Sequence, residues 1–231
     1  MRMSWAKGYP IERYSDLLGG TEKDHVIVYT SKEFQPFSEL CSETYSFVGP
    51  IIKKPDRILE KSDKKTIYIS LGTIFNNKID FFKNCIEALK DSSYEVIISV
   101  GSVIQPEELG ELPDNIQVRQ RVNQIEVLQR TDVFLSHCGM NGANESLFYE
   151  VPLVMFPQGA DQGVVADRIA ELGAGVLLKK YTAKDIRNAI ELVLHNPQYK
   201  ENAKKISESF KRSGGVKEAV DKIEFVMNQK N

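Results

Sequence analysis

The sequence predicts an α/β fold in the form of a Rossmann-like, doubly wound parallel sheet, and two patterns point to it. From residue 66 onward, short apolar runs rich in β-branched residues alternate with longer segments in which apolar residues recur every three or four positions. Strands that alternate with helices pair in parallel through right-handed crossovers. The runs are numerous enough for a single sheet that carries helices on both faces.

Each expected strand stops at a residue that favours a turn or at a polar residue. Gly72 follows the first strand and Gly101 follows the second, and glycine accepts the backbone angles that a sharp turn needs. These stops place the strand boundaries. In chain order, strands are expected at 66–71, 94–100, 116–119, 132–136, 152–156 and 176–178.

The segments between the strands have the spacing of amphipathic helices. Ile79, Phe82 and Ile86 fall on one face of the first such segment. Gly173 follows the last of them, in the place where a left-handed residue ends many helices. These helices are expected at 79–89, 124–130, 141–149 and 161–172.

Three more helices are expected after the last strand. Thr182 and Asp185 form a start similar to a capping box, and Pro197 stops that helix. A second helix is expected at 198–211, and Gly215 breaks the chain before the last one. The last helix has an apolar stripe that we expect to face inward, made of Val216, Val220, Ile223 and Met227.

Residues 1–50 fit the alternating pattern poorly. They hold one clear strand at 25–29 and a candidate second strand at 45–48, and a charged stretch at 51–65 follows them. A single strand cannot bury both of its faces, so the first segment is expected to be a remnant of another domain. The chain is therefore expected to consist of this remnant, a linker at 51–65 and a ligand-binding domain at 66–231.

Composition excludes several classes of protein. A net charge of −2 argues against a nucleic-acid partner, because such proteins usually carry a basic face. No apolar run reaches the length of about 18 residues that a membrane span needs, and the N-terminus lacks the apolar core of a signal peptide. Cys41, Cys85 and Cys138 form no CxxC pair, which is typical of a reducing compartment. We therefore expect a cytoplasmic protein.

Polar residues follow the first and fourth expected strands. In the common strand order 3-2-1-4-5-6 these two strands are neighbours, and ligands bind outside their carboxyl ends. Ser70, Gly72 and Thr73 follow the first strand, and His137 and Gly139 follow the fourth. The sequence thus predicts that these five residues meet in one crevice.

The helix expected from Asn141 would open toward that crevice. Its first N–H groups lack partners within the helix and its dipole favours an anion, so a diphosphate suits the site. Gly139 and Gly142 would keep side chains away from the phosphates, and His137 would donate an imidazole N–H. Each residue also has an ordinary structural interpretation: Asn141 as a simple helix cap and His137 as a buried structural histidine.

Three more polar side chains suit a ligand that carries a ribose and a second sugar beside the diphosphate. Glu145 lies one helical turn beyond the phosphate site, where a carboxylate can accept from both hydroxyls of a ribose. Asp161 and Gln162 follow the fifth strand and suit the hydroxyls of a sugar, although Asp161 could equally be a helix cap. The chain has no P-loop, no GxGxxG after the first strand, no metal-ligand cluster and no Ser-His-Asp spacing, so no metal or other cofactor is expected.

With these motifs the chain resembles the two-domain nucleotide-sugar glycosyltransferases of the GT-B fold. It is most similar to their bacterial macrolide-type branch, which is related to the UDP-glycosyltransferases of plants and animals. The resemblance covers residues 24–229. It rests on YTSKEFQP (29–36), FVGP (47–50), YISLGT (68–73), ELPDNIQV (111–118), HCGMNGANES (137–146), PLVMFPQGADQ (152–162) and GAG (173–175).

The resemblance assigns a role to each matching residue. It implies that 1–50 are the end of the acceptor-binding domain and that the donor-binding domain follows, as the C-terminal half of a GT-B fold. Ser70, Gly72, Thr73, His137, Gly139, Asn141, Gly142 and Ala143 would bind the diphosphate, Glu145 the ribose, and Asp161 and Gln162 the transferred sugar. Arg121, Val122 and Gln124 would bind the base.

Three positions depart from the family's pattern. Arg121 stands where an aromatic residue usually stacks on uracil, although a guanidinium can also stack on a base. Asn123 replaces a proline, and Gly142 replaces a common serine. These departures affect the base preference and the affinity that the resemblance implies, and leave the fold unaffected.

The resemblance implies an inverting UDP-sugar-dependent transfer of a hexose to a hydroxyl of a small lipophilic acceptor. The family's general base is a histidine of the acceptor domain that no residue here matches, so the chain alone is expected to bind a UDP-sugar weakly and transfer little. Two alternatives remain open. One is a UDP-sugar epimerase or a cell-wall GlcNAc transferase. The other is a non-catalytic subunit that binds a nucleotide-sugar and docks a separate acceptor-domain chain. The plainest interpretation is an inactive fragment that forms a homodimer through an apolar face left exposed by the missing domain.

Overall fold

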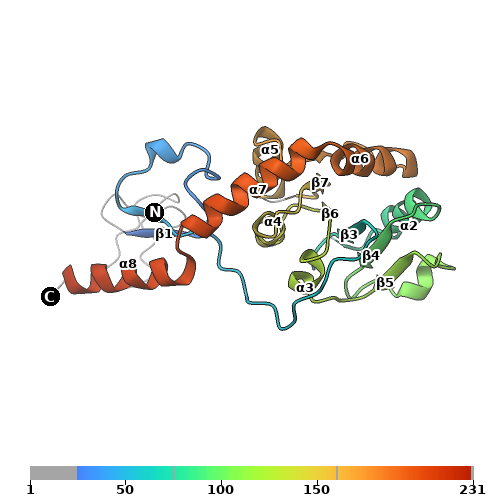
Figure 1. Cartoon of the computed structure of the whole chain (residues 1–231), viewed down its shortest axis with the longest axis horizontal. Coiled ribbons are helices and arrows are strands. Elements are labelled where there is room, and N and C mark those ends of the chain that lie inside the picture. The colour runs from blue at the N-terminus through green and yellow to red at the C-terminus, as the bar shows by residue number, and fades with distance from the viewer. Residues whose placement is uncertain (1–24, 75, 160, 230–231) are drawn as a thin grey trace, which may run out of the picture. The chain divides into compact units, whose positions relative to one another are not determined.

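The computed structural model describes residues 25–74, 76–159 and 161–229 (Figure 1). The chain divides into two compact units. Of the residues that the structure describes, the smaller unit comprises those up to Ile51 together with those from Ser209 onward, and the larger runs from Ile52 to Glu208. The C-terminal segment thus groups with the N-terminal one. The division into acceptor-domain remnant, linker and donor domain remains a prediction.

The larger unit is built on a parallel sheet of six strands in the order β5-β4-β3-β6-β7-β8. Numbered along this sheet, that is the predicted order 3-2-1-4-5-6. Ser70 at the end of β3 is in register with Ser136 at the end of β6, so the predicted switch point is confirmed. The strands are β3 (Thr66–Ser70), β4 (Glu95–Ser99), β5 (Ile116–Arg119), β6 (Val133–Ser136), β7 (Leu153–Met155) and β8 (Gly175–Leu177).

Alternation along the central strands sends side chains to two different helical layers. Ile67 and Leu135 belong to the apolar core that packs against α2 (Ile79–Leu89) and α6 (Ala183–His195). Tyr68 and Phe134 point to the opposite face, where their rings stack with centroids 4.5 Å apart. Figure 1 shows α2 and α6 on one side of these strands and α3 and α4 on the other.

Local sequence signals set the ends of the helices. Thr182 caps α6 by accepting a hydrogen bond from the Asp185 N–H at 3.2 Å, and Asn196 leaves the helix in an extended conformation before Pro197. Gly173 ends α5 at φ +66°, as predicted. The remaining helices of this unit are α3 (Gln124–Leu128), α4 (Met140–Phe148), α5 (Gln162–Glu171), the 3-10 helix η2 (Pro106–Leu109) and most of α7 (Pro197–Arg212).

Within residues 25–51 and 209–229, the smaller unit holds a parallel pair of short strands and one long helix. Phe34 packs edge-on against Phe210 with ring centroids 5.6 Å apart, and the Ser31 and Ser209 hydroxyls are 2.8 Å apart. These contacts tie the end of α7 to the loop after the first strand. The elements are β1 (Val26–Val28), the 3-10 helix η1 (Ser38–Leu40), β2 (Tyr45–Phe47) and α8 (Gly215–Gln229).

The predicted inward stripe of α8 is wrong for the residues that the structure describes. Its four members keep large exposed fractions: Val216 55%, Val220 44%, Ile223 48% and Met227 63%. The physical reason is the size of the partner. Two strands of three residues each offer too little apolar surface to cover a helix of fifteen residues.

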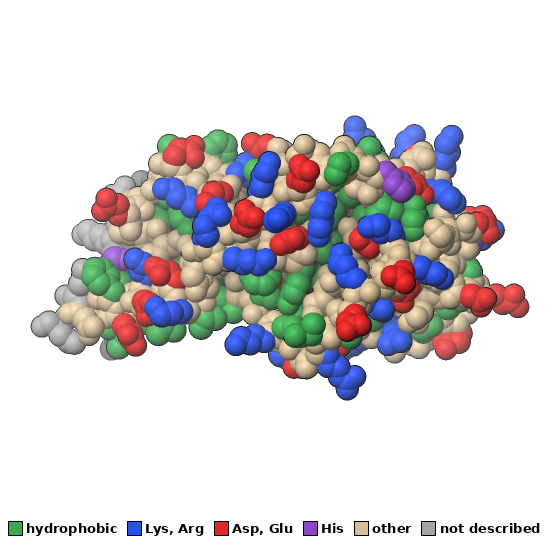
Figure 2. All heavy atoms as spheres, viewed as in Figure 1, with side chains coloured by type: hydrophobic (Ala, Val, Ile, Leu, Met, Phe, Trp, Pro, Cys, Tyr) green, Lys and Arg blue, Asp and Glu red, His purple; other side chains and the backbone are tan. Residues whose placement is uncertain are grey.

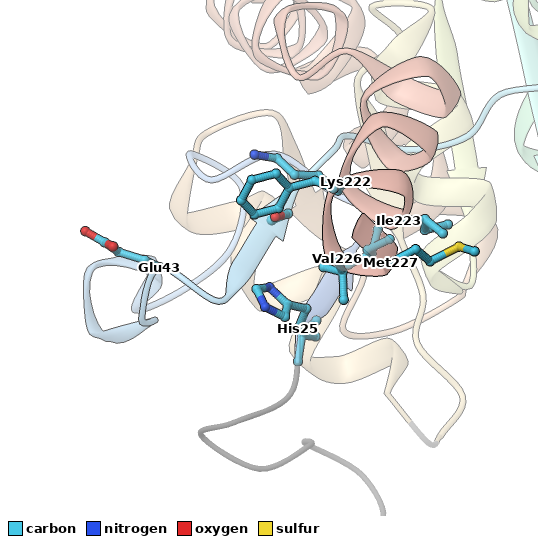
Figure 3. A pocket seen from close by; sticks show the side chains of 10 residues that line it. His25, Glu43, Lys222, Ile223, Val226 and Met227 are labelled. Atoms are coloured by element: carbon cyan, nitrogen blue, oxygen red, sulfur yellow. The ribbon is translucent and has the colours of Figure 1, made fainter. Parts of the chain in front are cut away.

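A cavity of about 220 Å³ lies within the smaller unit, between α8 and the two strands. Figure 3 shows Ile223, Val226 and Met227 of α8 on one side of it and His25, the residue before β1, on another. Glu43 projects away from these side chains. The cavity is largely apolar and holds none of the residues predicted to bind a ligand.

Candidate functional site

A cavity of about 400 Å³ opens at the carboxyl ends of β3, β4 and β5, on the β3 side of the switch point between β3 and β6. Its lining includes none of the predicted residues that follow β6 and β7. Half of its lining was predicted to bind a ligand: Ser70, Gly72, Thr73, Arg121, Val122 and Gln124. The rest of the lining, which sequence reasoning did not single out, consists of Tyr68, Asn76, Ser99, Gly101, Ser102 and Gln120.

His137 lies between the backbones of two glycines and joins the end of β6 to the end of β3. A Cβ atom on Gly72 would stand 2.5 Å from its Cε1 atom, and one on Gly139 would stand 2.6 Å from its Nε2 atom. No side chain fits at either position while the imidazole keeps its place. The two glycines therefore make room for the imidazole between the ends of β3 and β6.

The turn after His137 has an uncommon backbone conformation. Cys138 adopts φ +62°, which costs a non-glycine residue about 1–2 kcal/mol, and its N–H donates to the Ser136 Oγ atom at 3.1 Å. Conformations of this kind concentrate at functional sites. Burial raises the pKa of the Cys138 thiol to about 12, so the thiol is neutral and the turn presents backbone groups only.

Helix α4 begins one residue earlier than predicted, at Met140, and Gly139 is its N-cap without a side-chain hydrogen bond. The N–H groups of Met140, Asn141 and Gly142 are the ones that lack carbonyl partners within the helix. Ala143 was predicted among the donors, but its N–H already donates to the Gly139 carbonyl at 3.0 Å. Met140 takes that place, and the exposed Asn141 side chain does not cap the helix.

Burial lowers the pKa of His137, while the Ser70 backbone and the Asp161 carboxylate oppose that shift. The imidazole is therefore neutral at pH 7. Its Nδ1 atom is buried and forms no hydrogen bond with any residue that the structure describes. A neutral imidazole beside a helix N-terminus can donate one N–H to an anion, and an anion in turn favours its protonation.

Glu145 is held by a short chain of side-chain hydrogen bonds. Gln124 donates its Nε2 to the Glu145 Oε2 atom at 2.5 Å and accepts from the Tyr68 hydroxyl at 3.1 Å. Burial raises the pKa of the Glu145 carboxyl, and the bond from Gln124 partly offsets this. The second carboxylate oxygen of Glu145 stays available to a ligand, while the predicted base-binding amide of Gln124 is largely engaged.

The two residues at the start of α5 are in different states. Asp161 is exposed and makes no side-chain cap, so its carboxylate is available. Gln162 is buried, and its Oε1 atom accepts from the N–H groups of Gln158 at 2.7 Å and Gly159 at 3.3 Å. The oxygen of Gln162 therefore holds the loop before α5, and only its NH₂ group can serve a ligand.

In the part of the chain that the structure describes, no three His, Cys, Asp or Glu side chains are grouped to hold a metal ion, and no helix is long and apolar enough to cross a membrane. On the face shown in Figure 2, basic and acidic side chains are interspersed and form no single basic patch.

Residues 53–231 match the family described as UDP-glucoronosyl and UDP-glucosyl transferase. An uncharacterized UDP-glucosyltransferase of Bacillus subtilis, YojK, is 42% identical over 90% of this chain and 53% of its own. Oleandomycin glycosyltransferase of Streptomyces antibioticus is 29% identical over 96% of this chain and 53% of its own. The solved structure of the glycosyltransferase of kitacinnamycin superposes with a TM-score of 0.85, at 28% identity, over 94% of this chain and 58% of its own.

The chain thus spans about half the length of the curated relatives it matches. Its six-stranded parallel sheet corresponds to one half of the solved GT-B structures, the half that binds the nucleotide-sugar donor. The resemblance read from the motifs is confirmed at the level of fold and family. This chain belongs to the UDP-glucoronosyl and UDP-glucosyl transferase family and covers its donor-binding domain.

Proposed function

We propose that the chain binds a UDP-sugar across the carboxyl ends of β3 to β6, as the donor site of an inverting hexosyltransferase with a small lipophilic acceptor. The observation that carries this is the insertion of His137 between Gly72 and Gly139. This packing brings the turn that carries Thr73 next to the free N–H groups of α4. An imidazole, a hydroxyl and three backbone donors then surround the place of a diphosphate.

The other parts of the UDP-sugar are assigned to residues around this diphosphate position. Glu145 accepts from the ribose hydroxyls through the oxygen that Gln124 leaves free. Arg121 is exposed at the mouth of the cavity, where its guanidinium stacks on the base and the Val122 backbone reads the base edge. Asp161 accepts from hydroxyls of the transferred sugar, and the NH₂ group of Gln162 donates to them.

In the transfer step, the acceptor oxygen forms a bond to the anomeric carbon as the bond from that carbon to the diphosphate breaks. The bonding electrons pass to the diphosphate oxygen, and the acceptor proton passes to a base of the acceptor-binding half. The donors around the diphosphate stabilise the charge that develops there. Glu145 holds the nucleotide through its ribose, and Asp161 and Gln162 fix the transferred sugar relative to the incoming oxygen. The chain alone binds the donor and transfers little.

A thermal-shift screen followed by calorimetry tests this proposal. UDP, UDP-glucose, UDP-GlcNAc and dTDP are added to the full chain, because a ligand that favours the folded state raises its melting temperature. We expect UDP and at least one UDP-sugar to raise the melting temperature and to give a one-to-one binding isotherm. No response to any of the four at millimolar concentration would overturn the proposal.

A further inference from the structure

Asn76 is a buried polar residue of the same cavity, and the roles assigned above do not include it. It follows the turn at the end of β3, and only 1% of its surface is exposed. Its Nδ2 atom donates to the Gly72 carbonyl at 2.7 Å. Its Oδ1 atom is buried without a hydrogen-bond partner among the residues that the structure describes.

The neighbouring strand makes room for this side chain. Gly101, which follows β4, adopts φ +80°, and a Cβ atom there would stand 2.0 Å from the Asn76 Nδ2 atom and 2.8 Å from its Cγ atom. Glycine is therefore required at this position both by the backbone angle and by the space that Asn76 occupies. Asn76 thus bridges the turns after β3 and β4 at the wall of the cavity.

The bond to Gly72 has a direct consequence for Thr73. The Gly72 carbonyl and the Thr73 N–H belong to the same planar trans peptide and point in opposite directions. Fixing the carbonyl toward Asn76 therefore fixes the Thr73 N–H away from it and sets the direction from which the Thr73 side chain leaves. Gly72 itself is conformationally permissive at φ +75°, so the turn needs such an external constraint.

We propose that Asn76 is a positioning residue of the donor site, which orients the Gly72–Thr73 peptide toward the diphosphate and depends on Gly101 for its place. This inference rests on the proposed function, because it takes the diphosphate as the ligand of Thr73. It predicts an effect confined to the phosphate part of the ligand. A role in general stability would weaken the binding of every part of the nucleotide equally.

The test compares UDP with uridine, which lacks the phosphates. Binding of UDP is measured by calorimetry and binding of uridine by ligand-observed NMR, on the full chain and on Asn76→Ala, Asn76→Asp and Gly101→Ala. Asn115→Ala is the matched control, because the Asn115 Nδ2 atom also donates to carbonyls, those of Leu89 at 3.0 Å and Tyr94 at 3.2 Å, outside this cavity. Thermal unfolding of each variant checks that it folds.

Asn76→Ala is expected to weaken UDP binding about three- to tenfold, the equivalent of one neutral hydrogen bond, and to change uridine binding less than about twofold. Asn76→Asp keeps the size of the side chain but sets an oxygen against the Gly72 carbonyl, so its loss should be at least as large. Gly101→Ala should reproduce the loss. Combined with Asn76→Ala it should add little, because both changes remove the same contact.

Equal losses for UDP and uridine, or unchanged UDP binding in both folded Asn76 variants, would overturn the inference while the proposed function stands. A wild-type chain that binds UDP no more tightly than uridine would overturn both the inference and the proposed function. Since Asn76→Asp preserves volume, it carries the test if Asn76→Ala fails to fold.

Discussion

Removal of the Glu145 carboxylate gives the sharpest test of the assignment of Glu145 to the ribose. Glu145→Ala takes away the group that we assign to the ribose and leaves the phosphate donors of His137 and α4 in place. Gln124 already occupies one carboxylate oxygen, so the ligand gains the bonds that the other oxygen accepts. Ribose hydroxyls are the expected donors of those bonds.

The magnitude follows from the number and kind of these bonds. A hydrogen bond to a charged acceptor contributes about 1.5–3 kcal/mol, and the partial burial of Glu145 places it toward the upper end. Gln124 regains some hydrogen bonding with water in the variant, which reduces the net loss. We therefore expect Glu145→Ala to cost about 2–3 kcal/mol of UDP binding, which is a factor of about 30 to 140 in the dissociation constant.

Calorimetric titrations with UDP and with 2′-deoxy-UDP separate the ribose contact from a general effect. The wild-type chain should bind 2′-deoxy-UDP about tenfold more weakly than UDP, whereas Glu145→Ala should bind the two alike. Glu87→Ala is the matched control, because Glu87 is an exposed helical glutamate with a lysine partner, Lys90, and should leave both affinities unchanged. Equal discrimination between the two nucleotides in wild type and Glu145→Ala would refute the ribose assignment.

Three further predictions concern the base, the diphosphate and the cysteines. Because Arg121 is assigned to stack on the base, Arg121→Ala should weaken UDP binding by about 1–3 kcal/mol in calorimetry, and Arg121→Trp should restore the affinity. An unchanged affinity in Arg121→Ala would exclude the stacking role. Burial lowers the pKa of His137 in the free chain, whereas a bound diphosphate favours the imidazolium. The affinity for UDP-glucose should therefore rise as the pH falls from about 8 to about 6, and it should not change with pH in His137→Gln. A wild-type affinity that does not change with pH would contradict the assignment of His137 to the diphosphate. Cys41 should be the one thiol that a mild alkylating agent modifies in the folded chain, because burial raises the pKa values of Cys85 and Cys138. Mass spectrometry detects the modified residue, and rapid labelling of Cys85 or Cys138 would contradict their burial.

Much of the fold followed from periodicity and from a few turn residues. The strand order and the meeting of Ser70 with Ser136 at the switch point were predictable, because alternating strands and helices allow few topologies. Helix ends were predictable where a single residue sets them, as Thr182 does for α6 and Gly173 for α5.

The details that sequence reasoning missed depend on tertiary contacts. Helix α4 starts one residue early, with Gly139 as its N-cap, and the residue before that cap, Cys138, takes a left-handed conformation that its residue type does not favour. The engagement of Gln124 by Glu145 and Tyr68 joins three elements, and no local pattern reveals it. The exposure of the α8 stripe likewise reflects the small size of the sheet beside it.

The signal for Asn76 was present in the sequence only in part. A glycine at position 101 after a strand indicates a turn, and many strand-to-helix turns carry one. Glycine is also required at position 101 because the Asn76 side chain, from a loop 25 positions earlier, occupies the space that a Cβ atom would need. Pairwise packing of this kind requires coordinates.

A crystal structure of the full chain with UDP tests the proposed donor site most directly. We expect the diphosphate to lie within hydrogen-bond distance of the Thr73 hydroxyl, the His137 imidazole and the N–H groups that open α4, with the ribose on Glu145. A nucleotide bound elsewhere, such as in the apolar cavity beside α8, with none of these groups in contact with it, would contradict the proposed donor site.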